Sequence, residues 1–94
     1  MIVVRNTFIA KPGMASKLAE QIKAAATAAK LPDHRVLTDM TGDFNRVIFE
    51  YVVADLAGVD ARMKDYASNS ALRDGLKGYT DLYLTGSREL LQTA

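Results

Sequence analysis

The chain contains neither cysteine nor tryptophan, only one histidine and only two prolines. Without cysteine it has no disulfide bond, no thiolate metal site and no cysteine nucleophile. A zinc site takes three or four protein ligands, so the single histidine, His34, does not make one. We expect His34 to be a surface or interface residue, and we expect neither a metal nor a cofactor.

Long apolar runs and an excess of charge are also missing. No apolar stretch approaches the roughly 18 residues that cross a membrane, and the formal net charge is +1. The opening Met-Ile-Val-Val-Arg-Asn lacks a basic segment followed by a long apolar one, so we expect no cleaved signal and a cytoplasmic protein. Neither nucleic acid nor an anionic membrane is an expected partner.

The 94 residues are enough for one domain, 1–94, with an apolar fraction of 49% that is typical of globular proteins. Ile2–Ala10 is rich in β-branched residues and has no helical period, which predicts a strand. Pro12 and Gly13 end it. From Met14 to Lys30 apolar residues recur with the helical period, so this segment is a predicted helix.

A hairpin is predicted next. Residues 34–41 alternate loosely, residues 41–43 (Thr-Gly-Asp) supply turn chemistry, and residues 44–53 alternate strongly. Asp55 is a predicted N-cap of a second helix. The apolar stripe of that helix is Leu56, Val59, Met63 and Tyr66.

Ser-Asn-Ser at 68–70 interrupts the second helix, and residues 71–77 add a further turn or two. Residues 79–91 form the last predicted strand, with a bulge or bend at Gly86. The resulting order, βαββαβ, is that of the ferredoxin-like fold. It predicts an antiparallel four-stranded sheet with both helices on one face.

Such a fold leaves the second face of the sheet uncovered. Alternation places a partly apolar set of residues there, which we expect to form an interface: Val3, Arg5, Ile9, Ile48, Glu50 and Val52. An exposed patch of several hundred Å² usually marks an interaction site. We expect a second copy to pack sheet against sheet about a two-fold axis, where Arg5 and Glu50 would be able to pair. A solvated, half-polar sheet is the alternative.

Several segments resemble dimeric α/β-barrel proteins, in particular the NIPSNAP-like group and the small antibiotic-biosynthesis monooxygenases. They are the opening strand with its Lys-Pro-Gly turn (1–13), the hairpin Thr-Gly-Asp-Phe-Asn-Arg-Val-Ile-Phe-Glu-Tyr, the Asp55-Leu56 helix start and residues 84–89. The resemblance spans nearly the whole chain as a pattern of elements. It implies a ferredoxin-like protomer whose dimer forms a barrel from two four-stranded sheets, often with a small-molecule pocket between sheet and helices.

Within this resemblance Asn6 matches an asparagine that lines the pocket of related haem-degrading enzymes. Those enzymes also have a tryptophan and a histidine, where this chain has about Val53 and Leu76. Without the histidine no axial ligand for haem iron remains, so haem degradation is not expected. A buried amide satisfied by backbone groups is the alternative for Asn6.

The resemblance and the strand faces together give a candidate pocket: Asn6, Phe8, Phe49, Tyr51, Tyr66 and Tyr83. Binding of a small apolar or aromatic molecule is the expected function. A cofactor-independent monooxygenase acting on a phenolic or quinone-like substrate is the alternative, in which donors would stabilise a substrate anion. For each tyrosine, ordinary packing of a partly buried residue is the favoured explanation over catalysis.

RNA-recognition domains share the βαββαβ order, which makes an RNA-binding module a third hypothesis. Val3-Val4-Arg5-Asn6 loosely resembles their first-strand motif. Residues 45–49 (Asn-Arg-Val-Ile-Phe) do not provide the stacking aromatics of their third strand. Acylphosphatases also share the topology, but Lys-Pro-Gly-Met is not their anion-binding loop.

Overall fold

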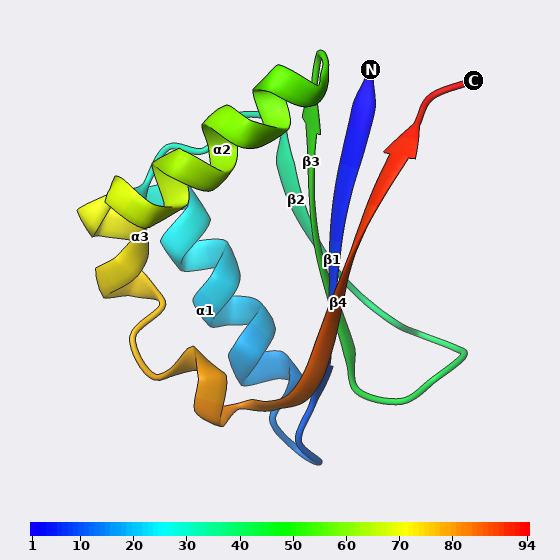
Figure 1. Cartoon of the computed structure of the whole chain (residues 1–94). Coiled ribbons are helices and arrows are strands. Elements are labelled where there is room, and N and C mark those ends of the chain that lie inside the picture. Colours follow the sequence, from blue (N-terminus) through cyan, green and yellow to red (C-terminus); the bar gives the residue numbers. More distant parts are fainter.

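Four antiparallel strands form one sheet in the order β2-β3-β1-β4, and the helices all lie on one side of it (Figure 1). This computed structural model describes all 94 residues. The elements are β1 (Ile2–Ala10), α1 (Ala15–Ala28), β2 (His34–Thr38), β3 (Arg46–Val53), α2 (Leu56–Ser68), α3 (Ser70–Gly75), the 3₁₀ helix η1 (Tyr79–Asp81) and β4 (Tyr83–Gln92). The predicted ferredoxin-like fold is confirmed.

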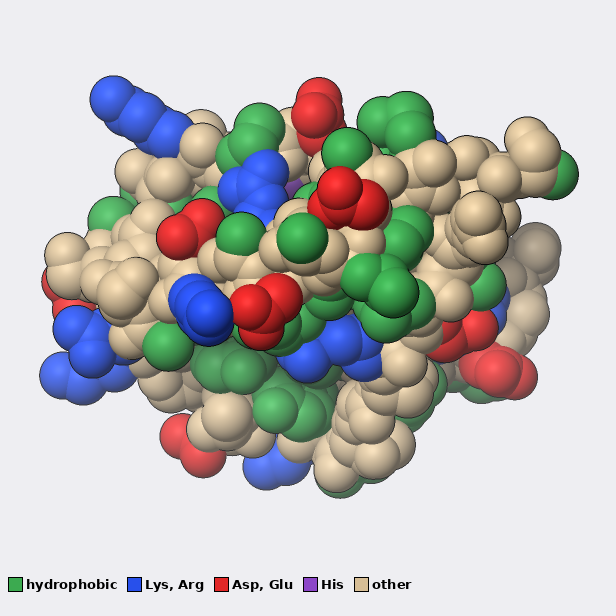
Figure 2. Space-filling view, turned by 45° about the horizontal axis from the view of Figure 1, so that its top comes forward, with side chains coloured by type: hydrophobic (Ala, Val, Ile, Leu, Met, Phe, Trp, Pro, Cys, Tyr) green, Lys and Arg blue, Asp and Glu red, His purple; other side chains and the backbone are tan.

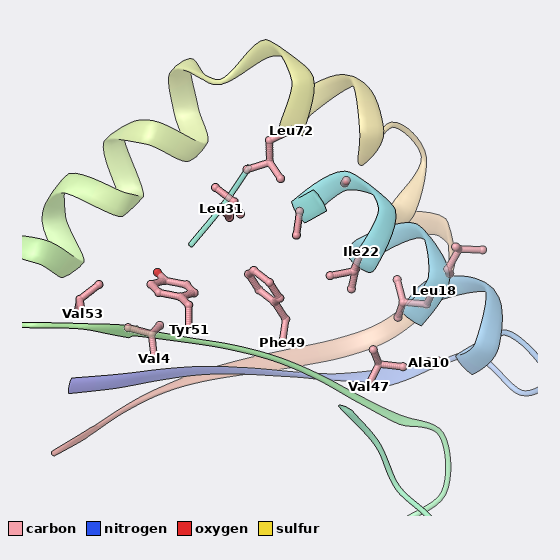
Figure 3. Close-up of a cluster of buried hydrophobic side chains, with 13 residues drawn as sticks. Val4, Ala10, Leu18, Ile22, Leu31, Val47, Phe49, Tyr51, Val53 and Leu72 are labelled. Carbon is pink, nitrogen blue, oxygen red and sulfur yellow. The ribbon is translucent and has the colours of Figure 1, made fainter. Parts of the chain in front are cut away.

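The core lies between the sheet and α1. The inward side chains of β1 and β3 include Val4, Val47, Phe49 and Tyr51, all of them buried. They meet Leu18 and other apolar residues of α1, and the rings of Phe49 and Tyr51 rise from β3 toward the helices (Figure 3). The predicted alternation of both strands is correct, because each puts its more apolar set on the helix side.

Helix α2 is attached differently from α1. It has no buried residue, and Leu56 at its start is 66% exposed. The predicted stripe is therefore wrong at Leu56. Helix α2 starts beside the end of β3 and rises from there away from the sheet toward α3 instead of packing flat on it (Figure 1). Its start is capped by Asp55, whose carboxylate accepts a hydrogen bond from the backbone N–H of Gly58 at 2.9 Å. Asn69 caps α3 in the same way.

The ends of two strands differ from the prediction. Strand β2 stops at Thr38, and residues 39–45 form a loop in which Gly42 and Asn45 have positive φ angles. Residues 79–81 are helical, so β4 starts at Tyr83. The irregularity in β4 falls between Tyr83 and Thr85 and not at the expected Gly86.

Gly86 has another role. A Cβ atom there would lie 3.2 Å from the backbone oxygen of Thr7 and 3.3 Å from the ring of Phe8, which covers it. The small residue thus lets β4 approach the Phe8 side chain closely. No helix of the chain combines the length and the apolar character needed to traverse a bilayer.

Candidate functional site

A cavity of about 530 Å³ lies between the sheet and the helices. Its floor is formed by side chains of β1, β3 and β4: Asn6, Phe8, Phe49 and Arg88. Helix α1 supplies one wall, and α2, α3 and η1 close the rest with mostly apolar side chains that include Met63, Tyr66, Leu72 and Tyr79. Because α2 stands away from the sheet, the space beneath it is left unfilled.

Asn6 and Arg88 form the polar part of the floor. They are directly opposite each other in the register of β1 and β4. The Asn6 amide nitrogen donates to the backbone oxygen of Phe49 at 3.3 Å, and its oxygen accepts from Arg88 Nε at 2.6 Å. Asn6 is only 6% exposed, so these two bonds fix the orientation of its amide. Asn6 thus borders the cavity with an amide whose nitrogen is bonded to the backbone and whose oxygen is bonded to a side chain.

Tyr66 lines the cavity from α2, and its ring meets that of Tyr51 edge-on at 5.8 Å. Neither hydroxyl forms a hydrogen bond with a protein atom. Burial, reinforced by the neighbouring Tyr51, raises the pKa of Tyr66 far above its ordinary value. Tyr66 therefore stays a neutral phenol at physiological pH and offers a hydrogen-bond donor rather than a base.

A second aromatic group lies at the other end of the floor. The ring of Tyr83 lies 5.0 Å from that of Phe8 and 5.6 Å from that of Tyr79. Burial, with a smaller effect of Tyr83, raises the pKa of Tyr79 as well. Tyr79 reaches the cavity, whereas Tyr83 is not among the residues that line it.

The structure thus brings four of the six expected pocket residues together around the cavity: Asn6, Phe8, Phe49 and Tyr66. Tyr51 and Tyr83 lie behind this lining, where they pack on Tyr66 and on Phe8. Sequence reasoning missed Arg88 and Arg73. Alternation along β4 was the available signal for Arg88. It puts residues 86 and 88 on the same face of the sheet, which is the helix side, where they lie opposite Phe8 and Asn6.

The expected interface residues lie on the face of the sheet that the helices do not cover, called here the open face. Val3, Arg5, Ile9, Ile48 and Val52 are half-buried there. Glu50 is 2% exposed, and it pairs within the same chain with Arg5 from β1 and with Arg35 from β2, at 2.7 Å for the latter. These partners are cross-strand neighbours.

His34 is half-buried at the start of β2. Its Nδ1 lies 2.6 Å from the backbone oxygen of Leu31, so this nitrogen carries the proton and donates. The residue thereby fixes the connection between α1 and β2. No group of three or more histidine and acidic side chains gathers in a way that would hold a metal ion.

No protein-family model and no curated protein sequence matches this chain significantly. Solved structures do match it. An uncharacterised NIPSNAP domain protein from Burkholderia xenovorans aligns with a TM-score of 0.84 at 15% identity, over 100% of this chain and 95% of that one. A NIPSNAP family protein from Agrobacterium tumefaciens aligns with a TM-score of 0.85 at 14% identity, over 99% and 92%. The chain has the NIPSNAP fold.

An antibiotic biosynthesis monooxygenase has a similar structure, with a TM-score of 0.73 at 13% identity over 100% of this chain and 99% of that one. The resemblance to both groups is therefore confirmed at the level of the fold. At such low identity it does not transfer an activity, so the function has to be argued from the cavity and the open face.

Proposed function

We propose that this protein is a homodimer whose cavity binds a small apolar or aromatic molecule. The cavity supports this most directly. Its volume of about 530 Å³ lies within the range of roughly 300–1,000 Å³ found for small-molecule sites. Its lining also has the usual composition of such sites, with many apolar side chains and a few polar groups held in fixed positions.

The open face supports the homodimer. A row of four charged residues crosses all four strands in the order Arg35, Glu50, Arg5, Glu89, because each is opposite the next in the register. Apolar residues lie on both sides of this row, namely Leu37 and Ile48 on one side and Val3, Val52 and Leu91 on the other. Apolar residues on both sides of an ordered row of charges are typical of a protein–protein interface and not of a surface that faces only water.

The charges also select a geometry. Glu50 lies between Arg5 and Arg35, which leaves positive charge in excess near β2, while Glu89 lies at the β4 end of the row. If two open faces meet about a two-fold axis parallel to the strands, β2 of one copy lies over β4 of the other. Arg35 then meets the partner's Glu89 twice in one dimer. A two-fold axis perpendicular to the strands would instead place Arg35 against the partner's Arg35.

Two measurements test the proposal. Light scattering at micromolar concentration is expected to give about twice the mass of 10.3 kDa. Titration with N-phenyl-1-naphthylamine, a neutral apolar dye, is expected to give saturable fluorescence with about one dye per chain. A monomer of 10.3 kDa would contradict the homodimer, and the absence of saturable dye binding would contradict the binding function.

A cofactor-independent monooxygenase acting on a phenolic or quinone-like substrate is the second candidate. The Asn6–Arg88 pair favours it, because it puts a cation and a fixed amide where an oxyanion would be stabilised. The fold likeness to an antibiotic biosynthesis monooxygenase points the same way. Oxygen uptake with phenolic substrates should then fall strongly in Asn6→Ala, and no uptake by the unmodified protein removes this candidate for those substrates.

RNA binding has less support. The open face carries aliphatic and hydroxyl residues such as Val3, Thr7 and Ile48, and no aromatic ring on which a base would stack. On the face seen in Figure 2, acidic and basic side chains are interspersed among hydrophobic ones. We therefore propose no nucleic-acid partner. A cytoplasmic location stays a prediction from the sequence.

A further inference from the structure

We propose that the cavity selects an organic anion, a carboxylate or similar charged group on an apolar or aromatic body, with Arg88 and Arg73 as the groups that receive the charge. This inference rests on the proposed binding function and adds the chemical class of the ligand.

The distribution of arginines is the first observation. The chain has six. Arg5, Arg35 and Arg46 form ion pairs with carboxylates, and Arg62 lies over the ring of Tyr51. Arg73 and Arg88 form no ion pair, and both line the cavity.

The cavity contains no acidic group to balance them. Its lining includes two arginines and no aspartate or glutamate, and ten of its thirteen residues are hydrophobic. Both arginines are exposed residues at the border of the cavity, so water reaches their guanidinium groups, and the mostly apolar lining beside them supplies no counter-ion. The missing charge is therefore one that a ligand would bring.

The geometry of Arg88 suits this role. Its Nε donates to the Asn6 oxygen at 2.6 Å and its Nη1 lies 3.4 Å from the sulfur of Met63, so the guanidinium plane is held at two points. The N–H groups of Nη2 have no protein partner. A planar guanidinium held in this way can donate paired hydrogen bonds to a carboxylate.

Two neutral phenols lie around the same space. Tyr66 comes from α2 and Tyr79 from η1. Burial raises the pKa of both phenols, and the positive charge of Arg88 opposes this with a smaller effect on each. The charge of Arg88 thus acts on both phenols. The Tyr66 hydroxyl, which has no protein partner, is a further donor for an anionic oxygen.

The test compares two dyes that share one scaffold. The dye 8-anilinonaphthalene-1-sulfonate carries a negative sulfonate, and N-phenyl-1-naphthylamine is the same molecule without the sulfonate. We expect the unmodified protein to bind the anionic dye at least about tenfold more tightly, the usual effect of a charge-assisted hydrogen bond.

Three variants locate the effect. Arg88→Gln and Arg73→Gln should each weaken binding of the anionic dye several-fold and change binding of the neutral dye less than about twofold. Lys23→Gln, which removes the same charge from an exposed position on α1, should change neither. A fourth variant, Ala67→Trp, fills the cavity from α2 and should weaken both dyes. Circular dichroism melting checks that each variant is folded.

The outcomes separate the two proposals. If the neutral dye binds and the anionic dye binds no better, the inference fails and the binding function stands. If neither dye binds, both fail. If the anionic preference survives in the Arg73→Gln, Arg88→Gln double variant, or if Ala67→Trp leaves the anionic dye bound as before, the arginines of the cavity are not its site and the inference is wrong.

Discussion

Glu50 shows how a charged residue is buried on a face without helices. Its carboxylate is covered by arginine side chains from the strands on both sides. Burial alone would raise its pKa, but hydrogen bonds from Arg5 and Arg35 and their positive charge lower the pKa of Glu50 below its ordinary value of 4.5. Protonation of this one residue would leave both arginines without their partner.

Acid should therefore destabilise the protein through Glu50. A group whose pKa is lower in the folded state stabilises it fully above pH 4.5 and loses that contribution as pH falls through the folded pKa. Glu50→Gln should cost about 2 kcal/mol at pH 7, less than for a fully buried pair because both arginines remain in contact with water.

The measurement is urea unfolding between pH 7 and pH 3. The Glu50→Gln variant should lose less stability on acidification than the unmodified protein. Asp60→Asn removes a carboxylate from an exposed ion pair with Lys64 on α2 and serves as the control. Equal acid sensitivity of Glu50→Gln and the unmodified protein would contradict this role of Glu50.

The position of a residue in the sheet was predictable where the alternation of a strand decides which face the side chain is on. Asn6 stood out because a polar residue interrupts the apolar side of β1, and the structure places it in the cavity. Arg88 did not stand out in the sequence. Alternation along β4 gives its face, but its position opposite Asn6 depends on the pairing of β4 with β1, two strands far apart in the sequence. Arg5 and Glu50 were expected to face each other across an interface, and the cross-strand register brings them together within one chain.

At the scale of the elements, α1 and α3 approach each other unusually closely. A Cβ atom on Gly75 would lie 2.7 Å from the Cβ of Ala25. The side chain of Gln21 on α1 donates to the backbone oxygens of Gly75 and Lys77, at 3.1 and 2.9 Å. The end of α3 is thus fixed to α1 both by close packing and by two hydrogen bonds.

Gly75→Ala should destabilise the protein by about 1–3 kcal/mol through overpacking, although the same change in an ordinary helix stabilises it. Thermal or urea unfolding measures the effect. In an Ala25→Gly background the 2.7 Å contact disappears and only the 3.0 Å contact with the Cα atom of residue 25 remains, so Gly75→Ala should there destabilise the protein less. A stabilising effect of Gly75→Ala by itself would show that the two helices are free to separate.

Elements with a strong period or a clear cap were predictable in advance. The helix from Met14 to Lys30 and the interruption at 68–70 follow from local sequence. The η1 turn and the irregularity near Tyr83 were not predictable in this way, because Tyr79, Thr80 and Leu82 are residue types common in strands. In the structure Gly78 has a positive φ angle, and the N–H groups of Asp81 and Leu82 donate to the backbone oxygens of Gly78 and Tyr79. The distance of α2 from the sheet is likewise a tertiary property.

At the scale of the whole molecule, the row of charges makes the proposed dimer testable by exchange. Glu89→Arg would bring two positive charges together at each of the two contacts, and Arg35→Glu would bring two negative ones together. Each variant alone should therefore dimerise at least about tenfold more weakly. A mixture of the two variants should recover dimers. In a mixed dimer, the unchanged Arg35 of one chain meets the unchanged Glu89 of the other, and the introduced arginine meets the introduced glutamate, so both contacts join opposite charges.

Analytical ultracentrifugation of each variant and of the mixture measures this exchange. Glu20→Arg, the same change of charge on an exposed position of α1, should leave dimerisation unaffected. If mixing brings no recovery, the two-fold axis does not run along the strands. High salt should weaken these contacts, as it does any charge pair that water reaches.

The loose attachment of α2 has a consequence for how a ligand would reach the cavity. Helices with few buried side chains open more often than the rest of a protein, by sub-global fluctuations that leave the core intact. Backbone amides of α2 should therefore exchange their hydrogens with solvent sooner than those of α1. Entry and release would then need only a brief departure of this one helix, while the sheet beneath keeps its pairing.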